Sequence, residues 1–114
     1  SRRLSYKAKT LLLDDNHFKV IPSIVLAEMF YLYSKHRIAT HVKRASEMIQ
    51  ASRNCIVYPL DENVIEKLSP DLDIHDGIIC ATALLYRDVL GHDVAVITKD
   101  ETIAEKGSVK TVWN

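Results

Sequence analysis

The sequence predicts a three-layer α/β/α fold in which helices cover a mostly parallel central sheet. Strand-like and helix-like segments alternate along the chain, which is typical of strand–helix–strand units. The run Val94–Ile97 is apolar throughout, as expected of a strand buried on both faces. With only 3 Gly and 3 Pro among 114 residues, no linker or repeat is evident. We therefore expect one domain over residues 1–114.

Hydrophobic periodicity and capping residues set the expected elements. These are, in order, a helix over 6–13, a strand over 19–21, helices over 24–35 and 39–51, a strand over 56–58, a short helix over 62–68, a long helix over 75–90, a strand over 94–97, a helical turn over 102–106 and a strand over 109–113. The expected helix N-caps are Ser5, Ser23, Asp61 and Asp73. Gly91 is expected to close the long helix.

Composition bounds the class of protein. Hydrophobic residues make up 47% and charged residues 26%, which are ordinary values for a soluble globular protein. Lys plus Arg and Asp plus Glu number 15 each, so the formal net charge is zero. This balance argues against a strong nonspecific grip on nucleic acid, although it leaves room for a few local contacts.

The cysteines and the apolar runs indicate a cytoplasmic protein. Cys55 and Cys80 lie far apart in the sequence and are expected to be free, buried thiols in a reducing compartment. No apolar run approaches the roughly 18 residues that a membrane span needs. Ser1–Arg3 leads into mixed residues rather than into a secretory signal.

Three acidic residues interrupt apolar or structured segments. Glu28 is the only charged residue between Ile21 and Tyr33, in a helix expected to be buried on most sides. An unpaired carboxylate there would be costly, so Glu28 is expected to pair with a base, become protonated, bind a metal or face a crevice. The alternative is a narrow solvent-facing stripe on that helix.

The other two acids stand at ends of elements. Asp76 opens the long helix, where a structural account through the helix dipole and capping-box spacing to Asp73 is also available. Asp100 follows the apolar strand 94–97, and the carboxyl ends of parallel strands are where α/β proteins place ligand sites. A simple turn residue is the alternative for Asp100. Glu101 is expected to be the first-turn acid of the next helix.

Taken together, Glu28, Asp76 and Asp100 can converge at one edge of a parallel sheet. Clustered carboxylates repel, and one becomes protonated unless a cation neutralises them. An all-oxygen site suits Mg²⁺ or Mn²⁺, and such ions activate water and stabilise charge on a phosphate during hydrolysis.

Four segments together resemble the PIN-domain family, with the VapC-like toxins of prokaryotic toxin–antitoxin pairs as the nearest branch. The segments are Ile21–Glu28, Ile74–Leu84, Val96–Glu101 and Val109–Trp113. The resemblance implies a metal-dependent endoribonuclease that hydrolyses RNA phosphodiester bonds, bound and masked by a small antitoxin and expected to form a homodimer.

The resemblance also assigns site residues. Glu28 matches the family's glutamate on the helix after the second strand, Asp76 the aspartate that opens the helix with Ala-Thr-Ala, and Asp100 the aspartate after Thr-Lys. These three are the expected catalytic and metal-binding residues, and Thr98 is expected to support the site by hydrogen bonding. The interval from Asp76 to Asp100 is longer than in the shortest members of the family.

The family's first strand, with its aspartate, has no counterpart upstream of Glu28. Asp14 and Asp15 follow a helix pattern and are expected at the surface. Because the family places that strand at the centre of the sheet, its absence would leave backbone groups of two neighbouring strands unpaired. We expect the natural protein to be longer than this sequence.

Other candidates are weaker. No pair of the five histidines has metal-ligand spacing, and only His75, beside Asp76, deserves a closer look. Basic residues that could contact RNA, or simply line solvated helix faces, are Arg2, Arg3, Lys35, Arg37, Lys43 and Arg44. The apolar region Met29, Phe30, Tyr31 and Tyr33 offers dimer or antitoxin contacts, although Met29 and Phe30 are expected in the core.

Two other functions fit less well. The first is a catalytically silent PIN-like binding or assembly module, which the missing first acid favours. The second is a receiver-like signalling domain, which would need adjacent acids at an early strand end and a late lysine. The order of acids along this chain fits the second poorly.

Overall fold

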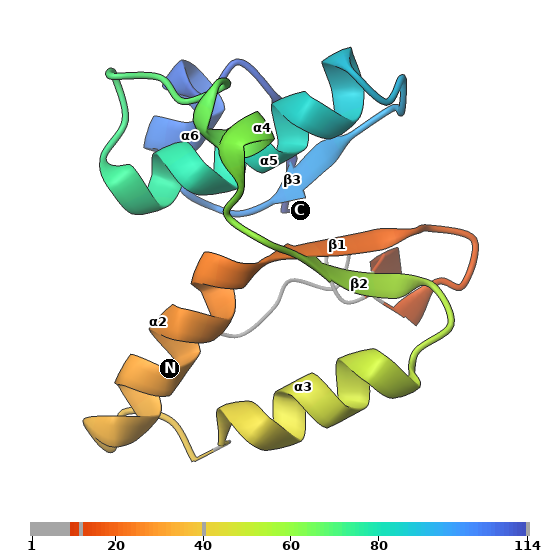
Figure 1. Cartoon of the computed structure of the whole chain (residues 1–114), viewed down its shortest axis with the longest axis vertical. Helices are drawn as coiled ribbons and strands as arrows, with labels where there is room; N and C mark the ends of the chain where they lie inside the picture. Colours follow the sequence, from red (N-terminus) through yellow and green to blue (C-terminus); the bar gives the residue numbers. More distant parts are fainter. Residues whose placement is uncertain (1–9, 12, 40, 114) are drawn as a thin grey trace.

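Helices alternate with short parallel strands along the chain, as Figure 1 shows for the computed structural model, which describes residues 10–11, 13–39 and 41–113. The elements are β1 (Lys19–Pro22), α2 (Ser23–Ser34), α3 (Val42–Ala51), β2 (Cys55–Tyr58), α4 (Glu62–Ile65), α5 (Ile74–Asp88), β3 (Ala95–Ile97), α6 (Glu101–Lys106) and β4 (Lys110–Val112). The mixed α/β class predicted from the sequence is confirmed.

The strands form two parallel pairs. β1 pairs with β2, with Val20 opposite Ile56, and β3 pairs with β4, with Val96 opposite Thr111. Within the described residues, no ladder of hydrogen bonds joins one pair to the other. The parallel pairing is therefore confirmed, while the described strands make two sheets rather than the single central sheet expected from the sequence.

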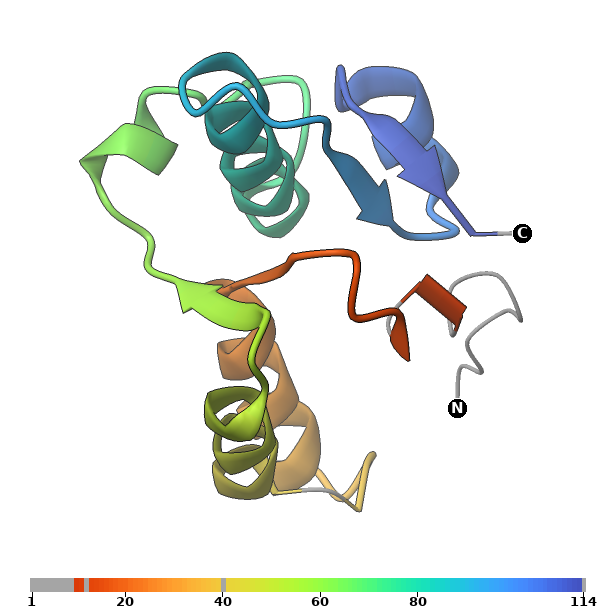
Figure 2. The ribbon, with the colours of Figure 1, turned by 90° about the vertical axis from the view of Figure 1, so that its right-hand side faces the viewer.

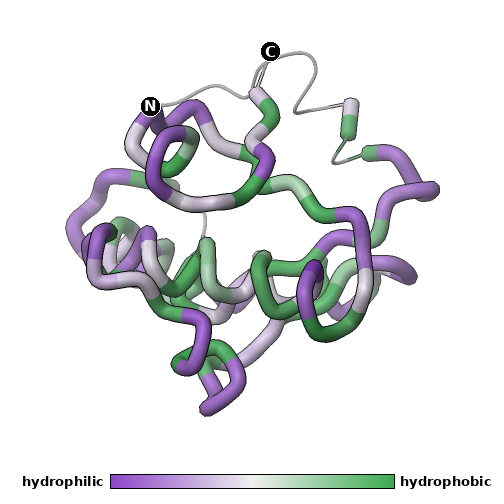
Figure 3. The backbone as a smooth tube through the Cα atoms, turned by 90° about the horizontal axis from the view of Figure 1, so that it is seen from above, coloured by the Kyte–Doolittle hydropathy of each residue, from purple (hydrophilic) through white to green (hydrophobic). Residues whose placement is uncertain are grey.

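The core lies around α5. Val64, Ile78, Ala81 and Leu85 form its centre, and Ile24, Tyr58 and Leu68 pack against it. Every buried hydrophobic residue among those described belongs to α4, α5 or α6. The apolar run of α5 is thus deeply packed, as its sequence predicts. In Figure 3 the hydrophobic segments of the trace are green and the hydrophilic segments are purple.

Helix α2 departs from the sequence prediction. Its run from Ile24 to Tyr33 is almost wholly apolar, yet none of its residues is buried. Phe30 and Tyr31 remain 54% and 57% exposed, and Met29 is half-buried. The helix contacts β1, α3 and part of α5, and these neighbours leave much of its circumference uncovered. The expectations that α2 is buried on most sides and that Phe30 lies in the core are wrong.

Side-chain caps explain where α4 and α5 begin. The Asp61 carboxylate accepts a hydrogen bond from the backbone N–H of Val64 at 3.0 Å, and Asp73 accepts one from Asp76 at 3.0 Å. Each satisfies a backbone donor in the first helical turn that has no partner within the helix. Both caps confirm the sequence prediction.

Other predicted boundaries differ from the structure. Ser23 is the first residue of α2 rather than its N-cap, since β1 runs directly into the helix and Pro22 occupies the cap position without a side-chain hydrogen bond. α3 begins three residues later than predicted, where the His41 ring accepts a hydrogen bond from the N–H of Lys43 at 3.0 Å. Ser5 and most of the predicted helix 6–13 lie outside the described residues.

The C-terminal ends of the helices also shift. α4 ends at Ile65 rather than at residue 68, and α5 ends at Asp88, two residues short of the prediction. The chain then turns through Gly91, whose φ of +76° favours glycine. The N–H of His92 donates to the carbonyl of Tyr86 at 3.0 Å, which closes the end of α5.

Both cysteines are free, with Cys80 buried and Cys55 half-buried. The prediction of free thiols is confirmed, while that of burial holds only for Cys80. No helix in the described part of the chain has the length and apolar character needed to cross a membrane.

Gly107 closes α6 against Cys80. A Cβ at this position would lie 2.6 Å from the Ile103 carbonyl oxygen and 2.8 Å from the Cys80 Sγ. Both distances are too short for a non-bonded contact of a Cβ atom. A Cβ on Gly77, inside α5, would meet nothing closer than 3.6 Å. A Cβ is therefore accommodated at Gly77 but not at Gly107.

We predict that Gly107→Ala lowers the free energy of unfolding by about 1–3 kcal/mol, because the added methyl group forces α6 away from α5. Gly77→Ala should instead raise it by up to about 1 kcal/mol, since alanine favours the helix. Urea denaturation of both variants checks this, and equal effects of the same sign would contradict the packing described for Gly107.

Candidate acidic site

Three elements bring the predicted acids toward one region. Glu28 lies in the middle of α2, Asp76 in the first turn of α5, and Asp100 caps α6 directly after β3. α2 and α5 pack against each other, and α5 packs against β3. Figure 1 shows β1 and β3 running in the same sense, so that their carboxyl ends, followed by α2 and by α6, lie on the same side of the molecule.

Asp100 is fixed by its role as a helix cap. Its Oδ1 accepts hydrogen bonds from the N–H groups of Thr102 at 2.8 Å and Ile103 at 3.4 Å. The hydroxyl oxygen of Thr98 accepts a hydrogen bond from the N–H of Asp100 at 3.0 Å. Thr98 thus orients the backbone that carries Asp100, and the residue itself is exposed to solvent.

Glu28 meets a base from a distant part of the chain. Its Oε2 lies 3.5 Å from the Nδ1 of His75, and the two side chains are 42% and 53% exposed. Such an exposed pair stabilises little by itself. Its consequence is positional, because it ties the acid of α2 to the start of α5, one residue from Asp76.

The pKa of Asp76 is shifted by burial and by the charges around it. Burial raises the pKa of this half-buried carboxyl above its ordinary value, and the negative charges of Asp73, Asp100 and Glu28 raise the pKa further. Only His75 acts in the opposite direction. Asp100 and Glu28 therefore lie close enough to Asp76 for their charges to act on it. Asp73 belongs to this acidic cluster too, a role that its capping position in the sequence concealed.

The donor chemistry of the cluster suits a hard cation. Carboxylate oxygens are the ligands that Mg²⁺ and Mn²⁺ prefer. Within the ranges 10–11, 13–39 and 41–113, however, no three side chains of His, Cys, Asp or Glu are placed to hold one ion together. Mg²⁺ commonly uses only one or two carboxylates and completes its shell with water and phosphate oxygens.

The thiol nearest this region is a poor ligand. Burial raises the pKa of Cys80 to about 11, and the charges of Asp76 and Asp100 raise it in the same direction. The thiol is therefore protonated at neutral pH, whereas metal binding requires the thiolate. The site is one of oxygen donors.

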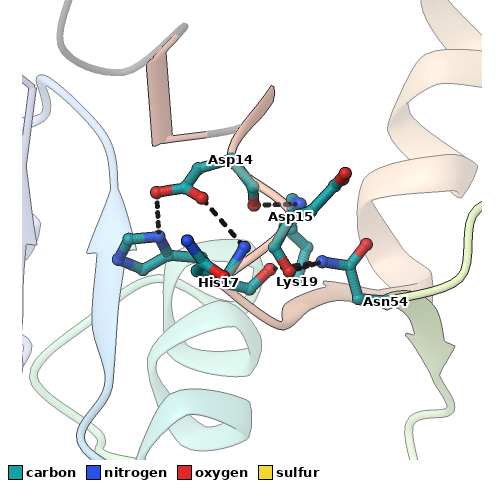
Figure 4. A network of polar contacts seen from close by, with 6 residues as sticks. Asp14, Asp15, His17, Lys19 and Asn54 are labelled. Carbon is teal, nitrogen blue, oxygen red and sulfur yellow. Dashed lines mark hydrogen bonds and ion pairs between the residues drawn. The ribbon is translucent and has the colours of Figure 1, made fainter.

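Asp14 and Asp15 serve the turn before β1, as Figure 4 shows. A hydrogen bond from the N–H of Asn16, together with His17, lowers the pKa of Asp14. The Asn54 amide donates to the carbonyl oxygens of Asp15 and His17 at 2.6 and 3.1 Å. Asp15 is exposed and Asp14 half-buried, so their role is local.

The histidines and basic side chains mostly have structural surroundings. His41 caps α3 and His17 pairs with Asp14. The Nζ of Lys35 lies 5.5 Å from the centre of the Tyr31 ring. Exposed basic residues are Lys35, Arg37, Lys43 and Arg44, while Arg2 and Arg3 lie outside the described residues.

No family model, curated protein or solved structure matches this chain. The fold and the site alone therefore describe the protein, as a mixed α/β chain in which the charges of Asp73, Asp100 and Glu28 act on Asp76 at the start of α5.

The raised pKa of Asp76 predicts a pH-dependent effect of Asp76→Asn. The folded chain binds this proton more tightly than the unfolded chain, so the carboxyl lowers the free energy of unfolding as pH rises through its ordinary value of 3.8 and the raised folded value. Asp76→Asn should match the parent at pH 3 and become relatively more stable by pH 7.

Denaturation at a series of pH values measures that difference, with Asp71→Asn as the control at an exposed acid in the turn before α5. A difference that moves against Asp76→Asn with rising pH would mean that attraction between the carboxylate and the N-terminus of α5 outweighs burial and repulsion.

Proposed function

We propose that this chain is a metal-dependent endoribonuclease of the PIN type, most similar in its site residues to the VapC-like toxins. The observation that carries the proposal is geometric: Glu28 of α2 lies 3.5 Å from His75, the neighbour of Asp76 in α5, and burial together with the charges of Asp73, Asp100 and Glu28 raises the pKa of Asp76. Carboxylates whose charges act on one position are stabilised when a cation enters. The three-layer fold with one central sheet is part of the same proposal.

Each residue has a separate role in this proposal. Asp76 and Asp100 hold a Mg²⁺ or Mn²⁺ ion from two adjoining elements, and Glu28 faces it from α2. His75 holds Glu28, at 3.5 Å between the ring Nδ1 and the carboxylate, and Thr98 fixes the backbone of Asp100. The bound ion supplies an activated water and neutralises charge on the phosphate.

The partners follow from the exposed surfaces. Phe30 and Tyr31 on α2 are more than half exposed, which is unusual for aromatic side chains and supports contact with an antitoxin or with a second copy of the chain. Exposed basic side chains that suit RNA phosphates follow the end of α2, at Lys35 and Arg37, and lie in α3, at Lys43 and Arg44. The protein acts in the cytoplasm in this proposal.

A catalytically silent binding module is the second candidate. The observation that favours it is the lack of three ligating side chains around one point within the described residues. In that case the chain binds a partner without cutting RNA, and exchanging the acids of the cluster for amides leaves partner binding intact.

We predict that the chain cleaves single-stranded RNA in the presence of Mn²⁺, and that EDTA abolishes the cleavage. Asp76→Asn, Asp100→Asn and Glu28→Gln should each lower the rate by about 100-fold or more, since each removes a carboxylate that would hold or face the metal ion. The measurement is the rate of product formation on a panel of labelled RNAs.

Asp93→Asn is the matched control, because Asp93 is exposed and pairs with Lys110 away from the cluster. Binding of Mn²⁺ should also raise the melting temperature of the parent and not that of Asp76→Asn. Metal-independent cleavage, or cleavage indifferent to all three exchanges, would contradict the proposal and point to a contaminating nuclease. Folded protein that neither cleaves nor binds Mn²⁺ would favour the silent module.

A further inference from the structure

One row of side chains on α2 leads from the acidic cluster to a basic segment. Glu28, Tyr31 and Lys35 are three and four residues apart, so they follow one another on one face of the helix. The helical register continues to Lys35, whose N–H donates to the Tyr31 carbonyl at 3.1 Å. Glu28 contacts His75 of α5, so the row begins at the cluster and ends about 10 Å further along the helix axis. This row of three side chains is the α2 stripe.

Tyr31, in the middle of the α2 stripe, presents an exposed aromatic ring. The ring is more than half exposed, and the Nζ of Lys35 lies 5.5 Å from its centre. Phe30 is similarly exposed but projects about 100° away around the helix, off the line from Glu28 to Lys35. An open aromatic face in a positively charged groove is the arrangement on which unpaired nucleobases stack.

The end of the α2 stripe that lies away from the acidic cluster carries charge of one sign. Between Glu28 and Glu47 the sequence contains no acidic residue. The charged side chains in this interval are exposed, and they are Lys35, Arg37, Lys43 and Arg44. The chain as a whole has a formal net charge of zero, so this local positive charge complements a polyanion at this surface.

Backbone and ring contacts hold these basic residues near one another. His36 has a left-handed backbone conformation with φ of 59°, and the N–H of Arg37 donates to the Leu32 carbonyl at 2.9 Å. This hydrogen bond closes α2 and fixes the direction in which the chain leaves the helix. The Tyr33 and His41 rings meet edge to face with their centres 4.7 Å apart, which holds the start of α3 against the end of α2. Figure 2 shows α2 and α3 side by side, with the segment that follows α2 at the end away from α5.

We propose that a single-stranded RNA follows the α2 stripe, with one unpaired base stacked on Tyr31 and backbone phosphates beside Lys35 and Arg37. This inference rests on the proposed nuclease function, because the scissile phosphate would lie at the acidic cluster, where Glu28 begins the stripe. Stacking needs an unpaired base and accepts any base, so Tyr31 selects single strands over duplexes without selecting a sequence. Tyr31 is a positioning residue, since it holds the strand and takes no part in bond cleavage.

The test measures RNA binding in EDTA, where no metal-dependent cleavage occurs, at a series of salt concentrations. The probes are a fluorescent oligouridine of about 12 nucleotides, an abasic strand of the same length, and the duplex of the oligouridine with oligoadenosine. The variants are Tyr31→Ala, Tyr31→Phe and Lys35→Ala. Phe18→Ala is the matched control, because Phe18 is also more than half exposed and precedes β1, at the opposite end of that strand from α2.

The expected result separates stacking from charge. Tyr31→Ala should weaken binding of oligouridine by about 5- to 100-fold, the effect of losing one base–aromatic stack, and should change binding of the abasic strand little. Tyr31→Phe should keep the parent affinity, because it keeps the ring. Lys35→Ala should reduce the slope of log affinity against log salt concentration by about 0.7, the contribution of one phosphate contact on a single strand. Phe18→Ala should match the parent on every probe.

Three outcomes would overturn the inference. They are parent-like binding of oligouridine by Tyr31→Ala, equally tight binding of duplex and single strand by the parent, and no RNA binding by the parent. In the first case cleavage in Mn²⁺ would still support the nuclease proposal, and Tyr31 would be left to protein contacts. Conversely, weaker binding by Tyr31→Ala together with no cleavage by the parent would support RNA binding at the α2 stripe and contradict the nuclease activity.

Discussion

The packing of α5 on both β1 and β3 is the constraint on which the remaining structure depends. The two strand pairs share no hydrogen-bonded ladder within the described residues, so this helix holds them in a common orientation. Its buried face carries most of the core, including Ile78, Ala81 and Leu85. The first turn of the same helix places Asp76 beside the other acids, so that core packing and the electrostatics of the site have one origin.

Much of the local structure was predictable because local chemistry determines it. Asp61 and Asp73 begin their helices through caps visible in the sequence, and the strand segments around Val20, Val57 and Val96 are short apolar runs. The prediction of burial failed where burial depends on residues that are distant in the sequence. The apolar pattern of α2 predicts burial, but only its surroundings in the fold determine whether anything covers Phe30.

The acidic site also combines features that the local sequence predicts with features that only the fold creates. The sequence singles out Glu28, Asp76 and Asp100 as acids in unexpected positions, and the charges of Asp100 and Glu28 add to burial in raising the pKa of Asp76. The contact between Glu28 and His75 joins two helices that are far apart in the sequence, and no local pattern predicts it. Asp73 was recognisable as a cap, while its charge on Asp76 becomes visible only in three dimensions.

Deamidation of Asn54 would change the contact between β2 and the turn before β1. Its amide nitrogen donates to two carbonyl oxygens of the turn before β1, and the next residue begins β2. Spontaneous hydrolysis of that amide would exchange the donor for a carboxylate facing two acceptors, close to Asp14 and Asp15. Deamidation at this one position would therefore remove both side-chain hydrogen bonds between the turn and Asn54, and only the backbone bond from the Lys19 N–H to the Asn54 carbonyl would remain there during prolonged storage.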